Sequence, residues 1–403
     1  MGGINAGDTA WLLVATALVM LMTPGVGLFY AGMVRRKNVV AMITLSIICM
    51  IVVGIQWVVY AYSLAFGKDV AGFIGDMSYF MLNNVGLEPV KGMTIPHLLF
   101  MIYQMMFAII TLAIITSAVA ERVKVSSFIV FGILWITFVY APFAHWLWGN
   151  GWLAKLGALD FAGGMVVHVS SGFGALALAF VIGRRMGYGE YSMEPHNIPL
   201  TLIGGALLWF GWFGFNGGSA LAANGLAVNA IVVTFVASCV AGAVWMVTSW
   251  IREGKPGSLS IISGVIAGLA AITPAAGFVD VKGAIAIGLV AGILCYIALD
   301  FRVRKGIDES LDAWAIHGIG GTWGSLAVGL FATKAVNDYA GLLYGNVALL
   351  KAQIIAVIAT VIYAFVVTYV LAKIVDVVMG LRVTREEEYV GLDVSQHGEV
   401  AYT

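Results

Sequence analysis

Charged residues are scarce in this sequence: Asp, Glu, Lys and Arg make up 10% of the 403 residues, whereas hydrophobic residues make up 61%. The mean hydropathy is +0.98. The 21 basic and 21 acidic residues cancel to a formal net charge of zero, and no run of Lys or Arg is long enough to suggest a nucleic-acid partner. This composition lies outside the range of soluble domains and predicts an integral membrane protein.

Cysteine is also rare. Cys49, Cys239 and Cys295 lie in apolar stretches without paired spacing, so we interpret them as small buried hydrophobic residues and expect no disulfide, metal or cofactor. The opening segment MGGINAGDTAW lacks the positively charged start of a signal peptide. No nucleophile is spaced from a base as an embedded hydrolase requires, so we do not expect an enzyme.

Long apolar runs are abundant. A spanning helix needs about 20 mostly apolar residues, and continuous runs of this kind follow one another along the chain, separated by short polar breaks. They predict an all-α, multi-pass protein of the cell membrane, surrounded by lipid, with eleven transmembrane helices. The expected spans are 8–31, 40–66, 97–120, 125–146, 161–183, 198–216, 226–250, 259–274, 282–300, 312–332 and 347–378.

The distribution of Lys and Arg predicts the orientation of these helices. Most basic residues lie in the polar breaks after the odd-numbered spans or beyond the last one: Arg35, Arg36, Lys37, Arg122, Lys124, Arg184, Arg185, Arg252, Lys255, Arg302, Arg304, Lys305, Arg382 and Arg385. The opposite side has Lys68, Lys91, Lys155, Lys282, Lys334 and Lys351, and Lys373 lies within the last span. Because basic loops stay in the cytoplasm, we expect the N-terminus outside and the C-terminus inside.

Two spans resemble each other. The segments LDFAGGMVVHVSSGFGALALAF and LDAWAIHGIGGTWGSLAVGLF each begin with Leu-Asp, reach a His, and have a Gly four residues after it, Gly172 and Gly321. Because five spans separate them, such a repeat must be inverted in the membrane. We expect inverted five-helix units at about 8–183 and 198–332 and an eleventh helix at about 347–378. Together they form a transmembrane domain, 1–379, followed by a cytoplasmic tail, 380–403.

His168 and His317 are ionisable residues within predicted spans, which makes them functional candidates because a buried charge is costly. A lone buried histidine is more often a neutral ring bonded to a backbone carbonyl, but two at matched positions of a repeat favour function. A neutral imidazole has one donor and one acceptor nitrogen and exchanges protons near neutral pH. Two such rings suit a path for a small, polar, protonatable solute.

Asp160 and a group of aromatic residues are the other candidates. Asp160 precedes its span where an N-cap belongs, and its negative charge would also stabilise a cation near the outer mouth. Aromatic rings beside a hydroxyl can hold an ammonium-type ion, although interfacial Trp and Tyr are often simple membrane anchors. The residues of this group are Tyr103, Phe107, Trp148, Trp212, Phe215 and Ser219.

Several motifs together closely resemble the ammonium transporter (Amt) family over essentially the whole chain. They are MTPGVGLFYAGMVRRKN, DFAGGMVVH, WFGFNGGSA, AITPAAGFV, HGIGGTWG and the tail GLRVTREEEYVGLDVSQHGEVAY. The resemblance implies a homotrimer of eleven-helix subunits, each with its own pore. It places Trp148, Ser219, Phe107 and Tyr103 in an outer vestibule that recruits ammonium, where many relatives have Phe at the position of Tyr103.

The resemblance also implies roles along the pore. Phe107 and Phe215 would form a stacked gate, Trp212 the pore wall, Asp160 an essential structural and electrostatic carboxylate, and His168 with His317 a twin-histidine pair. Ammonium would lose a proton beside the gate and cross as ammonia, with separate proton transfer as an open possibility. The tail would pack on loops of a neighbouring subunit and help to bind a PII-type nitrogen-regulatory protein.

Two alternatives remain open on the sequence. A membrane cytochrome would use the two histidines as axial ligands of one haem, but would leave the Phe pair and the aromatic cup without a role. A Rhesus-type channel for neutral ammonia or carbon dioxide is closer, although the crowded cup and the tail favour cation recruitment. A sensor role would build on ammonium binding and need not replace transport.

Overall fold

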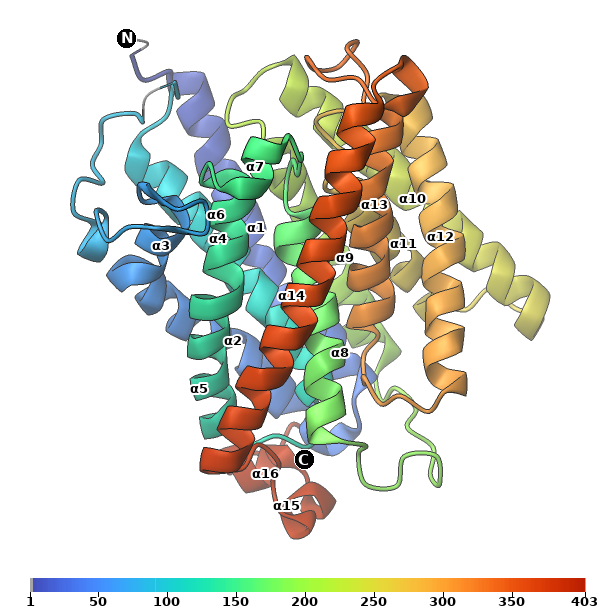
Figure 1. Ribbon diagram of the computed structural model, residues 1–403. Coiled ribbons are helices and arrows are strands. Elements are labelled where there is room, and N and C mark those ends of the chain that lie inside the picture. The colour runs from blue at the N-terminus through green and yellow to red at the C-terminus, as the bar shows by residue number, and fades with distance from the viewer. Residues whose placement is uncertain (1–2, 91, 403) are drawn as a thin grey trace.

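The computed structural model describes residues 3–90 and 92–402. The extreme ends of the two predicted domains (1–2 and 403) and Lys91 lie outside these residues. Figure 1 shows a bundle of long helices with the N-terminus at one end and the C-terminus at the other. We call these ends the N-terminal face and the C-terminal face.

The helices of the first half follow the predicted spans closely. The α-helices are α1 (Ala6–Met33), α2 (Val39–Gln56), α3 (Tyr62–Phe66), α4 (His97–Val119), α5 (Val125–Trp135), α6 (Ala141–Trp148), α7 (Trp152–Leu156) and α8 (Ser170–Ile182). Shorter elements are the 3₁₀ turns η1 (Arg36–Asn38) and η3 (Phe80–Leu82) and the antiparallel strands β1 (Asp69–Val70) and β2 (Ile74–Gly75).

The second half continues the bundle and ends in a folded tail. Its long helices are α9 (Ile198–Gly218), α10 (Gly225–Glu253), α11 (Ser258–Ile272), α12 (Val281–Arg304), α13 (Ile319–Phe331) and α14 (Val347–Met379). A 3₁₀ turn, η7 (Leu342–Tyr344), precedes α14, and the tail forms α15 (Arg385–Val390) and α16 (Leu392–His397).

Within residues 3–90 and 92–402, four π-helical segments interrupt the α-helical runs: η2 (Trp57–Ala61), η4 (Ile136–Tyr140), η5 (Gly164–Val169) and η6 (Trp314–Gly318). A π segment inserts an extra residue into a helical turn and is frequent at functional sites. Two of the four contain His168 and His317, so both histidines lie where the backbone departs from a regular α-helix.

In the described residues, nine helical segments are long and apolar enough to cross a membrane. The remaining two predicted spans, 259–274 and 312–332, correspond to the shorter α11 and to η6 followed by α13. Eleven spans, the inverted repeat and the orientation of the termini therefore stay predictions. The helix of span 161–183 begins at Gly164, after Gly163 with a φ of 112°. In span 312–332 the positive φ of Asp312, 65°, precedes the helix, and Ala313 is already helical before the π segment that begins at Trp314.

The bundle exposes apolar side chains on its outer helices. On α14, for example, Val377 is 84% exposed and Val378 74%. A continuous apolar surface of this kind is unfavourable in water but favourable against hydrocarbon. The exposed side chains therefore fit a helix bundle embedded in lipid.

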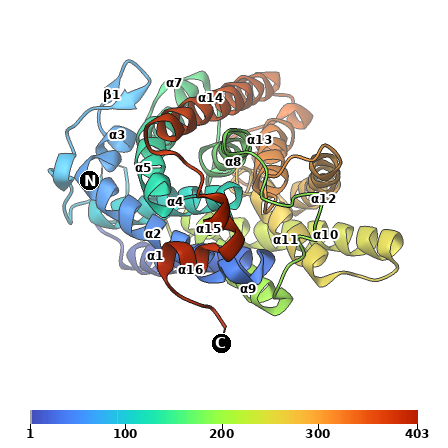
Figure 2. The ribbon, with the colours of Figure 1, turned by 90° about the horizontal axis from the view of Figure 1, so that it is seen from below.

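The tail packs across the C-terminal face (Figure 2). The Lys37 ammonium donates to the carbonyls of Glu388 and Tyr389, and the Asn38 side-chain oxygen accepts the Leu392 amide at 2.9 Å. The Glu388 carboxylate also accepts the Met186 amide at 2.6 Å. These contacts are with loops of the same chain, whereas the resemblance places the tail on a neighbouring subunit.

Buried ion pairs connect the loops of this face. Asp308 pairs with Arg185 at 2.8 Å and with Arg122 at 3.5 Å, while Glu121 pairs with Arg35 at 2.5 Å. Burial raises the pKa of the Asp308 carboxyl, but the guanidinium groups of Arg122 and Arg185 outweigh it, so the pKa lies below its usual value. The loops after α1, α4, α8 and α12 are thus held together by charge.

Candidate functional site

The two histidines meet in the middle of the bundle, where η5 and η6 approach each other. Nδ1 of His168 lies 3.2 Å from Nδ1 of His317, and the ring centroids are 5.2 Å apart at 29°. Both side chains are buried. Nε2 of His168 is buried without a hydrogen-bonding partner among the described residues. This nitrogen therefore remains free to bind a small polar solute.

Glycines make this close approach possible. A side chain at Gly172 would overlap the backbone of Gly318, and one at Gly321 would overlap Gly164 and the Cβ of His168. Both Gly172 and Gly321 were singled out by their position four residues after a histidine. Small residues let membrane helices approach closely, and here they bring the two imidazoles into contact.

A column of aromatic rings leads from His168 toward the N-terminal face. Trp212 stacks on His168 at 5.4 Å between centroids, and Phe215 lies 5.8 Å from it at 20°. Phe215 in turn lies 4.3 Å from Phe107 at 38°. The Trp212 indole donates to the Thr273 hydroxyl at 2.8 Å, which fixes the orientation of the ring. The Phe pair thus lies between the histidines and the N-terminal face.

A cavity of about 300 Å³ lies beyond the Phe pair. Phe107 and Trp148, both among its lining residues, meet edge to face at 5.9 Å. The Ser219 hydroxyl donates to the Phe215 carbonyl at 2.8 Å, which leaves its oxygen lone pairs as acceptors. The cavity is lined by Phe66, Met93, Phe100, Gln104, Phe107, Leu147, Trp148, Phe161, Ser219 and Leu221.

Tyr103 occupies a different place from the other predicted vestibule residues. It is fully buried and does not line the cavity. Its hydroxyl donates toward the carbonyls of Gly214 and Phe215, at 2.9 and 3.0 Å, and lies 3.3 Å from the Ser219 hydroxyl. The hydroxyl therefore binds the backbone at the end of α9 directly. It touches a cavity-lining residue only at Ser219.

Asp160 binds the start of the histidine-bearing helix. Its two carboxylate oxygens accept four backbone amides, from Gly163, Gly164, Met165 and Val166, at 2.6 to 3.1 Å. Its own carbonyl accepts the Trp148 indole at 2.8 Å. One residue thus satisfies the free amides of η5 and positions a wall of the cavity.

A second buried carboxylate, Glu309, was missed in the sequence. Glu309 precedes His317 by eight residues, as Asp160 precedes His168. It accepts the Trp314 amide at 3.0 Å and the Ser117 hydroxyl at 2.7 Å. The Leu-Asp comparison pairs Asp160 with Asp312, but Asp312 has a positive φ and binds Arg302 at 2.6 Å. The equal spacing, which needs no alignment of Leu-Asp, is the signal that would have identified Glu309.

The geometry excludes the haem alternative. The 3.2 Å between the two Nδ1 atoms leaves no room for a porphyrin between the rings. The interpretation of the two histidines as axial ligands of one haem is therefore wrong.

Membrane-spanning helices around a buried column of rings and imidazoles define the class: a multi-pass membrane protein of the transporter type. The profile of the Ammonium Transporter Family matches residues 10–402, and the chain belongs to this family.

Relatives of known sequence and structure agree with this assignment. The chain is 69% identical over 400 residues to "Ammonium transporter Amt1" of Archaeoglobus fulgidus, covering 99% of this chain and 100% of that one. It superposes on the crystal structure of Saccharomyces cerevisiae Mep2 with a TM-score of 0.91 at 36% identity, covering 99% and 92% of the two chains. A structure titled "Sensor Amt Protein" gives 0.90 at 32% identity, covering 97% and 98%.

Proposed function

We propose that this chain recruits ammonium at the cavity beyond the Phe pair, removes a proton there and conducts ammonia past His168 and His317. The observation that carries the proposal is the order of cavity, closely packed but tilted rings of Phe107 and Phe215, and paired imidazoles. Ammonium transport itself is the activity of the family to which the chain belongs.

Cation recruitment rests on the chemistry of the cavity walls. The faces of Phe107 and Trp148 attract a cation, and the Ser219 oxygen can accept an N–H bond from it. The buried Asp160, whose carbonyl holds the Trp148 ring, contributes negative charge nearby. An ammonium ion uses all of these features.

Deprotonation explains how potassium is rejected. Potassium and ammonium have similar size and charge, so a site based on size alone discriminates poorly. The apolar Phe pair desolvates whatever enters, and desolvation lowers the pKa of an amine. Ammonium can give up its proton, either to outside water or to the imidazole pair, and pass as ammonia, whereas potassium has no neutral form. Whether the proton follows separately through the imidazoles is decided by the current measured below.

The assembly and regulation follow from the family. We propose a homotrimer of subunits with eleven membrane helices in inverted repeat, the N-terminal face outside and the C-terminal face in the cytoplasm. The ordered tail supports regulation at that face, with a PII-type protein as the partner. Deletion of 380–403 is expected to alter activity or abolish regulation by PII.

The test is electrical. Purified protein in liposomes on a solid-supported membrane receives an ammonium jump and, separately, a potassium jump. We expect a current with ammonium only, and its loss in the His168→Leu, His317→Leu double variant. Ile358→Leu, at an exposed position on the outer helix α14, is the control and should keep the current.

Two outcomes would contradict the mechanism. If the double variant still takes up ammonium at the wild-type rate and still excludes potassium, the two histidines are not required for selective conduction. The absence of current together with internal alkalinisation by ammonia would indicate a passive gas channel of the Rhesus type instead.

A further inference from the structure

Two non-helical segments contribute to the wall of the cavity beyond the Phe pair. The segment 219–224 joins α9 to α10 and carries the lining residues Ser219 and Leu221, while the segment 92–95 precedes α4 and carries Met93. Leu221 has a φ of 55°, in the left-handed region that residues other than glycine rarely adopt. Such a backbone persists only where surrounding contacts hold it.

Asp8, in the first turn of α1, binds both segments. Its Oδ1 atom accepts the Ala223 amide at 2.8 Å, and its Oδ2 atom accepts the Thr94 hydroxyl at 2.5 Å. Thr94 is adjacent to Met93, and Ala223 follows Leu221 by two residues. One carboxylate thus connects two parts of the cavity wall, although Asp8 is not itself a lining residue.

A second contact of α1 holds the other side of Ser219. The indole of Trp11 donates to the Gly217 carbonyl at 3.1 Å. Trp11 follows Asp8 by three residues, so both side chains lie on one face of α1. Gly217 precedes Ser219 and Ala223 follows it, and α1 therefore fixes the chain on both sides of the hydroxyl that the cavity offers to a cation.

We infer that Asp8 is a positioning residue for ammonium recruitment, which holds Ser219 and Leu221 in the wall of the cavity. This inference rests on the proposed function, because that cavity is where the cation would be recruited. Asp8 acts through its two hydrogen bonds and not through its charge. An Asn side chain can make both bonds, by accepting the Ala223 amide and donating to the Thr94 oxygen, whereas Ala makes neither.

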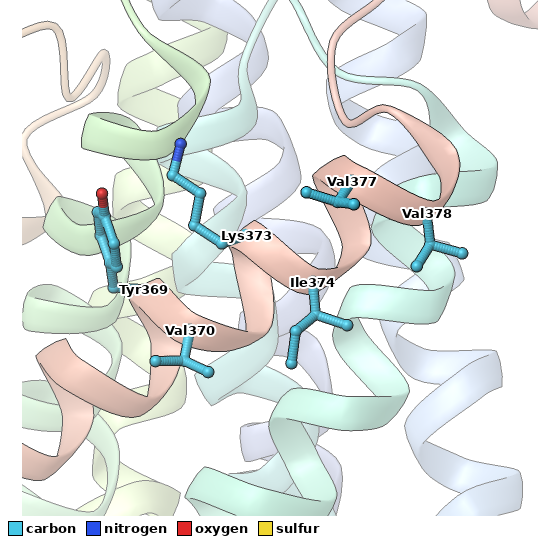
Figure 3. A pocket seen from close by; sticks show the side chains of 6 residues that line it. All are labelled: Tyr369, Val370, Lys373, Ile374, Val377 and Val378. Carbon is cyan, nitrogen blue, oxygen red and sulfur yellow. The ribbon is translucent and has the colours of Figure 1, made fainter.

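The ammonium concentration for half-maximal current tests this role. Asp8→Ala should raise it about tenfold, because both hydrogen bonds that hold the wall are lost. The maximal current should stay unchanged, since the ring column and the histidine pair are untouched. Asp8→Asn should stay within about twofold of the wild type. Val377→Ala, on the exposed surface of α14 (Figure 3), is the control and should match the wild type.

Hydrogen–deuterium exchange measures the contacts of Asp8 without transport. The Ala223 amide loses its acceptor in Asp8→Ala, so peptides that contain this amide should show it exchanging about tenfold faster. Peptides from α14 should exchange at the wild-type rate. Asp8→Asn should match the wild type in both regions, because the acceptor is retained.

Three results would overturn the inference. They are an unchanged half-maximal concentration in Asp8→Ala, unchanged exchange of the Ala223 amide in that variant, or an equal effect of Asp8→Asn, which would show that the charge attracts the cation. If Asp8→Ala does not fold, Thr94→Val removes one of the two bonds and should raise the half-maximal concentration about threefold, and no rise would equally overturn it. A wild type without ammonium current would contradict the proposed function instead, and the exchange rates would then decide whether Asp8 holds the segment.

Discussion

At the scale of residues, the site is built by side chains that bind backbone as much as by those that face the cavity. The Tyr103 hydroxyl donates to main-chain carbonyls, and the Asp160 carboxylate accepts main-chain amides. The sequence identifies both residues, but it does not show in which direction a hydroxyl or a carboxylate points. That direction is set by the end of α9 and by the turn before η5, which form only in the folded chain.

Replacement of Tyr103 by Phe separates the two roles of its hydroxyl. The variant leaves the Gly214 carbonyl without this donor and weakens the bonding around Phe215, so we expect a loss of about 1 kcal/mol in stability. Tyr103 does not line the cavity and touches it only through the 3.3 Å contact of its hydroxyl with Ser219. The ammonium concentration for half-maximal current should therefore change by no more than about twofold, less than the loss of one full hydrogen bond would give. A large change in that concentration at unchanged stability would show that the hydroxyl binds the cation.

Replacement of Asp160 by Asn tests the four amide contacts. Asn keeps one acceptor oxygen, so two of the four amides lose their partner. With hydrogen bonds to a charged group worth about 1.5 to 3 kcal/mol each, we expect a loss of about 3 kcal/mol or more and loss of the ammonium current. Thermal unfolding in detergent, followed by tryptophan fluorescence, measures the first effect. A variant of unchanged stability without current would assign Asp160 a purely electrostatic role.

At the scale of elements, the sequence predicts the helices well and their irregularities poorly. The run 97–120 corresponds to α4, His97–Val119, because a continuous apolar stretch leaves the backbone little alternative to a helix in a membrane. The π segments η5 and η6 could not be predicted, since the extra residue in the turn is decided by packing against the partner helix. Glu309 was missed because the two Leu-Asp pairs lie at different distances from their histidines: Asp160 precedes His168 by eight residues and Asp312 precedes His317 by only five.

The crossing of α8 and η6, directly after the two histidines in sequence, should be intolerant of a side chain at Gly172. Gly172→Ala would force Cβ into the Gly318 backbone, so we expect little folded protein and no current from what is recovered. Gly225→Ala is the control, because a Cβ there meets nothing within 4 Å. Size-exclusion chromatography of the two variants measures the yield of folded protein. Normal yield and activity of Gly172→Ala would mean that the helices can separate without consequence for the histidine pair.

At the scale of the whole molecule, charge is concentrated at the C-terminal face, where loops from four parts of the chain and the tail meet. The predicted tail turns out to be ordered, with a capping box at Thr384 and Glu387 that starts α15. The polar composition of the tail by itself predicts only a solvated or flexible segment at the cytoplasmic end of the chain. The acidic and basic partners lie far apart in the chain, as with Arg122 and Asp308, which are 186 residues apart, so their pairing could not be read from the sequence.

Asp308 gives this face a pH dependence. Its pKa is lowered, so its contribution to stability is complete above the ordinary value of about 3.9 and is lost as pH falls through the lower folded value. Asp308→Asn should therefore cost about 3–5 kcal/mol near pH 7, where it leaves buried guanidinium groups unpaired. The difference from the wild type should shrink as the pH approaches 3.

Thermal unfolding in detergent across this pH range measures the effect. Asp338→Asn, at an exposed carboxylate in the loop before α14, is the control and should match the wild type throughout. A constant difference between Asp308→Asn and the wild type at every pH would show that the Asp308 charge is not what holds the loops.

The contact between the two Nδ1 atoms makes the two imidazoles inequivalent, since only one of them can donate the shared hydrogen. Two neutral imidazoles that face each other through Nδ1 share one hydrogen, so one ring donates and the other accepts. The donating ring then presents a bare Nε2, and the accepting ring presents an Nε2–H. These roles are exchanged when the shared hydrogen moves from one Nδ1 to the other. To stay neutral, the former donor then gains a proton at its Nε2 and the former acceptor loses the one at its Nε2. The pair is therefore a two-position switch whose setting records which way the last proton moved.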